Sequence, residues 1–300
     1  MIPNLIKTSN MDCLICGSDK YRIIGIRPSA SFKEYRGQGS EIKIVQCKKC
    51  EFYYCKPMPI YEYDSLQSKY GEEYFDKAVQ RGIERAERNY YKIQKYIKKP
   101  SRILDIGCGQ GSFLYYCKLK GHEVEGFDIS EYSKQYVEAK YGIRVNCGDF
   151  LKLNMAMNSF DFIYCDQVLE HVYEPLLYIK KVHKLLRPDG KVYIGVPNEE
   201  SLVFYLSNLY FKLTRSQWTA NLSPLFPPYH IGGYTPKTLR YILEGARFKV
   251  EWMTTNVGSN DGMTAYHPLL AKTRENLLII ADKFNRGVQL EVVASKINDE

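Results

Sequence analysis

Four cysteines near the start of the chain have the residue type and the spacing of metal ligands. They form two Cys-x-x-Cys pairs, Cys13 with Cys16 and Cys47 with Cys50. In each pair both sulfurs can face one point, and two pairs supply the four thiolates of a tetrahedral zinc site. Because four thiolates leave no open position for water or a substrate, we expect the zinc to be structural rather than catalytic.

The residues between the two cysteine pairs predict short strands, as in a zinc ribbon. Residues 22–26 and 41–46 are β-branched or alternate between apolar and polar side chains. A segment of this size has too little interior to fold well alone, so the metal would supply much of its stability. Two alternatives stay open, a redox pair or the remnant of a site that has lost its metal. Cys55, just beyond the second pair, has no assigned role.

A second informative cluster is a glycine-rich turn that follows a buried strand at residues 102–106. Asp105 in that strand is followed by Gly107, Gly109 and Gly111. Glycines permit a tight turn and a close approach of the backbone to a ligand at the carboxyl end of a parallel strand. A carboxylate at the turn favours a cationic sulfonium ligand over a pyrophosphate, which prefers bare amides at a helix N-terminus. Gly111 also follows Gly109 by two residues, whereas the Gly-x-Gly-x-x-Gly of nicotinamide enzymes has three.

Carboxylates also end the next two expected strands. Asp128 ends the segment 122–128, and Asp149 follows the segment 143–148. Together with the glycine turn, this pattern resembles the cofactor site of class I S-adenosylmethionine-dependent methyltransferases, whose first motif is (D/E)xGxGxG, and the resemblance covers roughly residues 65–298. It implies that Asp128 holds both ribose hydroxyls, that Asp149 accepts from the adenine amino group, and that Phe150 packs on the adenine ring. The expected cofactor-binding residues are Asp105, Gly107, Cys108, Gly109, Gly111, Asp128, Ile129, Asp149, Phe150, Asp166 and Gln167.

The loop after the fourth strand reads Asp-Gln-Val-Leu-Glu-His-Val at residues 166–172. It matches the DxVLEHV form of the same family, in which this loop lies over the methyl group of the cofactor. Methyl transfer is an in-line displacement, so a base is needed only where the acceptor has a proton to lose. We hypothesise that His171 is the general base for a hydroxyl acceptor and that Glu170 orients it. The alternative is that this pair only ties the loop to the sheet.

A substrate cap is expected at about residues 199–234, between the fifth strand and the next helix. The stretch 202–211 is apolar and typical of a lid helix. The segment from His230 to Thr235 resembles the His-x-x-x-(Tyr/Phe)-Thr segment of sugar and quinone methyltransferases, so His230 is a second catalytic candidate. The alternative is a buried, hydrogen-bonding histidine beside a helix that starts at Thr235. The candidate substrate-binding residues, with core packing as their alternative, are Tyr70, Tyr74, Tyr229 and Tyr234.

The order of strands and helices predicts an α/β fold, a Rossmann-like seven-stranded methyltransferase sheet with helices on both faces. Residues 248–255 and 288–295 would complete the seven strands, with one strand antiparallel. An apolar stripe of residues three and four apart predicts a helix over 81–97 that packs on the core. We expect a zinc-binding ribbon at 1–58, a linker and helix at 59–100, and a catalytic domain at 101–300 that contains the cap.

Composition limits the partners without choosing one. The chain has 300 residues, a net charge of +8 and nine cysteines. No stretch is long and apolar enough for a membrane span, the start lacks a secretion signal, and cysteines in Cys-x-x-Cys pairs fit reduced thiols. We therefore expect a cytoplasmic protein that binds S-adenosylmethionine and a structural zinc. The positive charge would suit either an anionic small molecule or nucleic acid.

A ribbon joined to this catalytic domain resembles methyltransferases of surface-polysaccharide and deoxysugar pathways. The resemblance implies carbohydrate biosynthesis, with O-methylation of a nucleotide-linked sugar, a lipid-linked sugar or a glycan. One alternative is an RNA methyltransferase that uses the ribbon and the basic surface to bind RNA. Asp166 and Gln167 stand where methylases of exocyclic base amines have an Asn-Pro-Pro-Tyr motif, which argues against base amines. The other alternative is a non-catalytic interaction scaffold. The acceptor atom and the oligomeric state stay open.

Overall fold

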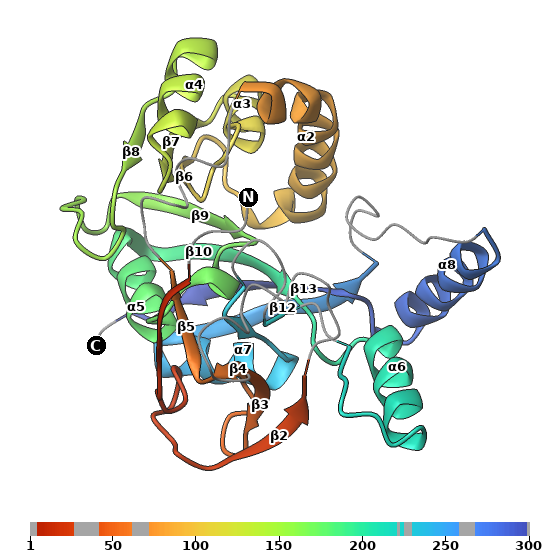
Figure 1. Cartoon of the computed structure of the whole chain (residues 1–300). Helices are drawn as coiled ribbons and strands as arrows, with labels where there is room; N and C mark the ends of the chain where they lie inside the picture. The colour runs from red at the N-terminus through yellow and green to blue at the C-terminus, as the bar shows by residue number, and fades with distance from the viewer. Residues whose placement is uncertain are drawn as a thin grey trace.

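The computed structural model describes residues 5–26, 42–61, 72–220, 223–224, 230–257 and 268–298. Its centre is a seven-stranded sheet with the strand order β12-β13-β10-β9-β6-β7-β8 (Figure 1). The neighbours from β10 to β8 are parallel, whereas β13 is antiparallel to both β10 and β12. This arrangement confirms the predicted Rossmann-like methyltransferase sheet. The strand bounds are β6 (Arg102–Ile106), β7 (Glu123–Asp128), β8 (Val145–Cys147), β9 (Phe160–Asp166), β10 (Leu186–Pro197), β12 (Phe248–Asn256) and β13 (Gln289–Lys296).

Helices cover both faces of this sheet. Successive side chains of each strand point to opposite faces, and the side chains on both faces are apolar. Ile103 and Phe162 pack under α2 and α3, while Leu104 and Ile163 belong to the core under α5 and α7. Both faces are therefore apolar, as expected for a buried, mostly parallel sheet. The helix bounds are α2 (Glu72–Ile93), η3 (Gln94–Tyr96), α3 (Ser112–Leu119), α4 (Glu131–Tyr141), η4 (Leu169–His171), α5 (Pro175–Leu185), α6 (Leu202–Leu213), α7 (Pro236–Gly245) and α8 (Pro268–Lys283).

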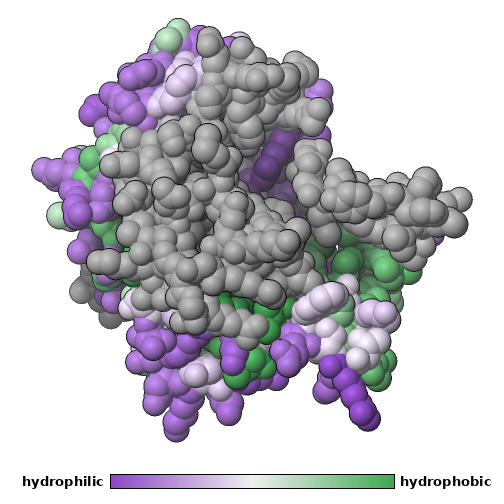
Figure 2. All heavy atoms as spheres, in the orientation of Figure 1, coloured by the Kyte–Doolittle hydropathy of each residue, from purple (hydrophilic) through white to green (hydrophobic). Residues whose placement is uncertain are grey.

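The helix expected over residues 81–97 begins earlier, at Glu72, and its last turn is the 3₁₀ segment η3. The predicted apolar stripe is buried at Ala86, Tyr90 and Ile93. Gly82 lies inside this helix without interrupting it. A Cβ at this position would lie 2.6 Å from the Ser112 hydroxyl oxygen, at the start of α3. The glycine therefore permits α2 to pack closely against the start of α3. The apolar stretch expected as a lid helix forms α6, whose apolar side chains contribute to the surface seen in Figure 2, and its role as a lid stays a prediction.

The N-terminal segment forms two small sheets. The first pairs β1 (Leu5–Ser9) with β5 (Met58–Tyr61). The second has the order β11-β4-β3-β2, in which β2 (Tyr21–Gly25), β3 (Lys43–Cys47) and β4 (Tyr53–Lys56) surround the cysteine pairs. Its fourth strand, β11 (Gly232–Gly233), comes from the far end of the substrate cap. The ribbon expected at 1–58 thus shares a sheet with the catalytic segment.

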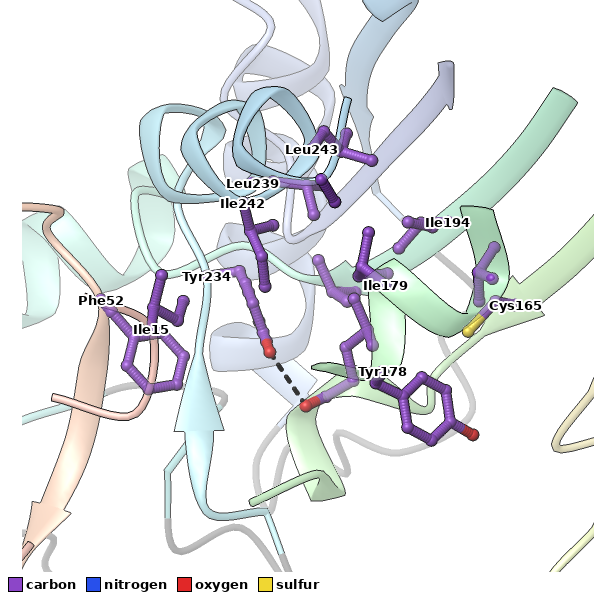
Figure 3. Close-up of a cluster of buried hydrophobic side chains, with 14 of the residues drawn as sticks. Ile15, Phe52, Cys165, Tyr178, Ile179, Ile194, Tyr234, Leu239, Ile242 and Leu243 are labelled. Carbon is purple, nitrogen blue, oxygen red and sulfur yellow. Dashed lines mark hydrogen bonds between the residues drawn. The ribbon is translucent and has the colours of Figure 1, made fainter. Parts of the chain in front are cut away.

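The ribbon and the catalytic segment also share one apolar core. Ile15 and Phe52 from the ribbon lie in the same cluster as Tyr234, Leu239 and Ile242, as Figure 3 shows. The helix start expected at Thr235 is confirmed, because the Thr235 hydroxyl accepts a hydrogen bond from the Thr238 amide and Pro236 opens α7. In the described part of the chain, no helix has the length and apolarity that a bilayer crossing requires.

Candidate active site

The four paired cysteines come together in the ribbon. Their sulfur atoms all lie within 4.8 Å of one another, with 3.4 Å between Cys13 and Cys50 and 3.5 Å between Cys16 and Cys47. None of the nine cysteines forms a disulfide. Zinc–sulfur bonds of about 2.3 Å in a tetrahedron place the sulfurs close to this spacing. The donor set therefore fits a structural zinc ion. Cys55 is buried in the neighbouring core and is not part of this group.

The glycine turn between β6 and α3 depends on glycine for two separate reasons. Gly107, Gly109 and Gly111 all have positive φ angles, of 74°, 51° and 71°, which other residues rarely adopt. In addition, a Cβ on Gly107 would lie 2.5 Å from Cγ2 of Val168. The Gly107 and Cys108 amides both donate to the carbonyl of Phe127 in β7. The turn is thus held by backbone hydrogen bonds between the neighbouring strands β6 and β7.

Carboxylates surround this turn. The Asp128 Oδ2 atom accepts a hydrogen bond of 2.8 Å from the Gly109 amide, and its Oδ1 atom accepts one from the Ser130 amide. Asp105 is buried beneath the turn, and burial raises its pKa well above the usual range, to which the charges of Asp166 and Asp128 add. Burial also raises the pKa of Asp128. Three acids thus lie around the turn, and a cationic sulfonium or ammonium group bound there would favour their ionised forms.

Asp149 and Phe150, which follow the third strand β8, already have partners within the protein. Asp149 accepts a hydrogen bond from the Leu151 amide and forms an ion pair with Lys152. The ring of Phe150 is buried, at 5.1 Å from the ring of Phe127 and 4.4 Å from that of Tyr178. The core therefore already surrounds much of this ring, and the expected stacking of Phe150 on the adenine stays a prediction.

Sequence reasoning missed a polar network between α2 and the end of β9. The guanidinium of Arg85 lies 2.7 Å from Oδ2 of Asp166, and the Tyr164 hydroxyl donates to the same oxygen. Asn89, one turn after Arg85, donates to the Tyr164 hydroxyl. The charge of Asp166 raises the pKa of Arg85 above its usual range. The available signal was that Arg85 and Asn89 are four residues apart beside the buried stripe of the helix.

Asp166 and Gln167 lie at the end of β9, next to the glycine turn that follows the neighbouring strand β6. We call the glycine turn, Asp105, Asp128 and these two residues the cofactor crevice. Within the described residues, Oδ1 of Asp166 and Nε2 of Gln167 are buried without a hydrogen-bond partner. Gln167 has a φ of 58°, a conformation that costs a non-glycine residue energy and occurs often at binding sites. A guanidinium next to these polar atoms can bind a carboxylate. The arrangement is therefore suited to the amino acid end of a cofactor such as S-adenosylmethionine.

The three predicted catalytic residues lie together. Glu170 is completely buried, and its two carboxylate oxygens have no hydrogen-bond partner among the described residues. The His230 Nε2 atom is 4.0 Å from Oε1 of Glu170, and the rings of His171 and His230 are 4.7 Å apart and nearly perpendicular. Burial raises the pKa of Glu170 to about 8. This group, the Glu-His-His cluster, can hold or move a proton near neutral pH, and its ligand atoms are close enough to hold a metal ion.

Neighbouring residues fix the orientation of His230. Its Nδ1 atom lies 2.6 Å from the Ser223 hydroxyl oxygen, and the Ser223 amide donates to the carboxylate of Glu199. Glu199 follows the end of β10 and is itself buried. This chain of contacts could not be predicted from the sequence, because Glu199, Ser223 and His230 have no regular spacing. It leaves the Nε2 atom of His230 directed toward Glu170.

The predicted substrate tyrosines have different outcomes. Tyr234 is completely buried, and its hydroxyl donates a 3.0 Å hydrogen bond to the Leu169 carbonyl. It therefore lies behind the Glu-His-His cluster rather than on a surface that an acceptor could touch. Tyr70 and Tyr229 fall outside the described residues. Tyr74 lies in α2, and the structure does not describe its side chain.

Comparisons with known proteins identify the domain family of this chain. A family model described as a methyltransferase domain matches residues 72–251. A ubiquinone biosynthesis O-methyltransferase of Coxiella burnetii is 29% identical over 139 residues, which are 45% of this chain and 57% of that protein. The chain thus aligns with little more than half of the length of this relative.

Solved methyltransferases share the fold. An S-adenosylmethionine-dependent methyltransferase from Archaeoglobus fulgidus has a TM-score of 0.51 and 23% identity, covering 74% of this chain and 98% of that one. One from Methanosarcina mazei has a TM-score of 0.51 and 21% identity, covering 70% and 99%. The chain belongs to the family of proteins with this methyltransferase domain.

Proposed function

We propose that this enzyme O-methylates a hydroxyl group of a sugar and that the Glu-His-His cluster removes the hydroxyl proton. The observation that carries the proposal is the pair of contacting histidines, His171 and His230, beside the fully buried Glu170. Glu170 and His171 of the cluster lie in η4, a few residues after Asp166 and Gln167, which border the cofactor crevice. The curated relatives named O-methyltransferases support oxygen as the acceptor atom.

The residues of the crevice bind and orient the cofactor, which supplies a methyl group on a cationic sulfur. Asp105, Asp128 and Asp166 provide acidic groups whose ionised forms a cationic ligand would stabilise, and Arg85 provides a positive group for a carboxylate. With the two reactants held in line, much of the rate comes from positioning. A hydroxyl oxygen that received this methyl group would have to lose its proton for the methylated product to be neutral. A nearby base completes this step.

Either histidine can accept that proton, and Glu170 can stabilise the resulting imidazolium. Because burial raises the pKa of Glu170 to about 8, its carboxyl is mostly protonated at neutral pH. A positive charge forming on His230, 4.0 Å away, favours ionisation of Glu170. When a histidine accepts the hydroxyl proton, the carboxyl proton of Glu170 is released to solvent, so that the new imidazolium lies beside a carboxylate and the cluster again holds one proton.

A sugar is the acceptor class that we propose because the chain couples its catalytic domain to a cysteine ribbon, as the similar methyltransferases of polysaccharide and deoxysugar pathways do. The ribbon lies outside the region that the family model matches, residues 72–251, so the acceptor of the ubiquinone enzymes does not carry over with the match. RNA remains the alternative acceptor, but no described feature favours it over a small molecule.

The test is methyl transfer from isotopically labelled S-adenosylmethionine with three acceptor sets: nucleotide-linked sugars, phenolic quinone precursors and ribosomal RNA. Mass spectrometry of the product would locate the methyl group. We expect label on a sugar oxygen, with rates reduced at least a hundredfold by His171→Ala or His230→Ala. His183→Ala is the matched control, since His183 contacts the carbonyl of Ile297 away from the crevice. Label on nitrogen or carbon, or transfer undiminished in both cluster variants, would exclude the proposed chemistry. Label on a phenol or on RNA would exclude the sugar.

A further inference from the structure

The ribbon is joined to the acceptor side of the site by a short sheet contact. Strand β4 starts three residues after the second cysteine pair and pairs with β11, so that Tyr54 lies opposite Gly232 and Tyr53 opposite Gly233. The Cys47 amide donates to the Phe52 carbonyl, which ties the cysteine turn to the start of β4. The residues that would hold zinc are therefore linked through a few backbone contacts to the strand that follows His230.

Side chains strengthen this link. The ring of Phe52 is 5.2 Å from that of Tyr234, and it lies so close to Gly232 that a Cβ there would be 2.5 Å from the ring. The Thr238 hydroxyl, in the first turn of α7, donates to the carbonyl of Cys50. Figure 3 shows Phe52 and Ile15 on one side of Tyr234 and the helix α7 on another. The segment that carries Tyr234 is thus packed directly against the second cysteine pair.

On its other side the same segment holds the turn that carries Glu170. The Tyr234 hydroxyl donates to the carbonyl of Leu169, the hydrogen bond drawn in Figure 3. The Ile231 amide donates a 2.8 Å hydrogen bond to the carbonyl of Glu170 itself. Residues 231–234, which we call the bridging segment, therefore lie between the ribbon and η4. His230 comes immediately before this segment.

The cofactor crevice does not depend on these contacts. The glycine turn is held by the Phe127 carbonyl and by Asp128, both in β7, and Gly111 packs against Val137 of α4. Asp166 is held by Arg85 and Tyr164. These contacts come from the central sheet and from helices on the side away from the ribbon. The ribbon thus contacts one half of the site, the half that contains the proposed base.

We propose that the metal-loaded ribbon is a positioning element for the Glu-His-His cluster, and that Phe52 and Tyr234 transmit its effect. Metal occupancy then controls methyl transfer while leaving cofactor binding unchanged. This inference rests on the proposed role of the cluster. Small metal-bound modules lose their fold when the metal leaves, and β11 has only two residues, both glycine, which cannot form a stable strand without a partner. Loss of the ribbon therefore releases the bridging segment and with it His230 and η4.

The first experiment compares two tyrosine-to-phenylalanine variants of the full chain. Tyr234→Phe removes the hydrogen bond to Leu169, whereas Tyr54→Phe, in the adjacent strand β4, removes a buried hydroxyl that has no hydrogen-bond partner in the described residues. We expect Tyr234→Phe to lower kcat about tenfold and to shift its pH profile, with an affinity for S-adenosylhomocysteine within twofold of the parent. Tyr54→Phe should leave all three unchanged. Equal losses in both variants, or a weaker cofactor affinity in Tyr234→Phe, would overturn the proposal.

The second experiment removes the metal from the full chain with a chelator and restores it with zinc. Amide hydrogen exchange of residues 230–234 and 169–171 should accelerate at least tenfold and recover with zinc, while residues 103–111 keep their protection. Calorimetry should give the same affinity for S-adenosylhomocysteine with and without metal. If both regions lose protection together, the ribbon serves only global folding and the inference is wrong. Because this readout needs no acceptor, it stands even where the cluster variants refute the proposed chemistry.

Discussion

Replacement of Glu170 by Gln should change how the stability of the protein depends on pH. Glu170 is fully buried, and burial raises its pKa in the folded protein to about 8, against about 4.5 when the chain is unfolded. The folded state therefore holds the proton more tightly than the unfolded state does. The resulting stabilisation is complete below the unfolded pKa and is lost as the pH rises through the folded pKa.

The two pKa values give the expected size of the effect. We compare the free energy of unfolding of the parent with that of a protein whose side chain at this position is always neutral. The parent is less stable by about 2 kcal/mol at pH 6 and by about 5 kcal/mol at pH 9. Glutamine has nearly the same shape and does not ionise. The Glu170→Gln variant should therefore gain about 3 kcal/mol on the parent between pH 6 and pH 9, apart from any constant difference caused by the substitution itself.

Urea unfolding of both proteins at four pH values between 6 and 9, with zinc present throughout, measures this difference. Any pH dependence of metal binding is common to the two proteins and cancels. Glu123→Gln is the control, because the side chain of Glu123 is 71% exposed, and this variant should follow the parent at every pH. Parallel curves for Glu170→Gln and the parent would show that Glu170 is ionised over the whole range, and the proton-sharing role of the cluster would have to be abandoned.

Three further predictions concern the cofactor crevice and the metal. Gly107→Ala should weaken binding of S-adenosylhomocysteine at least tenfold in calorimetry, because a Cβ at this position would lie 2.5 Å from Val168. Gly121→Ala is the control and should bind normally, since Gly121 also has a positive φ but its Cβ would meet nothing within 4 Å. Equal affinities of the two variants would contradict the steric account. Arg85→Ala should weaken the same binding about tenfold or more and lower the melting temperature, since Asp166 loses its cation; an unchanged affinity would remove Arg85 from the site. Elemental analysis should find one zinc per chain in the parent and none in Cys50→Ser. The melting temperature of Cys50→Ser should fall by several degrees, because the ribbon loses the metal that stabilises it. A metal-free parent of full stability would exclude the structural zinc site.

The sequence alone determined the parts of this protein that depend on short-range patterns. Glycines at fixed spacing require a tight turn wherever the chain goes, and a carboxylate at the end of a strand stays at the edge of the sheet. Sequence patterns were therefore enough to predict that Asp105, Gly107 and Asp128 lie close together, and that the paired cysteines form one cluster. The stripe of α2 was also readable, because a helix places residues three and four apart on one face.

Tertiary structure decided the contacts between segments that are distant along the chain. Arg85 meets Asp166 across 81 positions, and the hydroxyl of Tyr234 reaches Leu169 across 65. The strand β11 consists of two glycines, which have low β-propensity, so no local pattern could announce that it joins the ribbon. The spacing of residues along the sequence shows which of them share a helix or strand. Which helices and strands contact one another depends on packing over the whole core. For that reason Tyr234, expected at the acceptor surface, proved to be buried between the ribbon and the turn that carries Glu170.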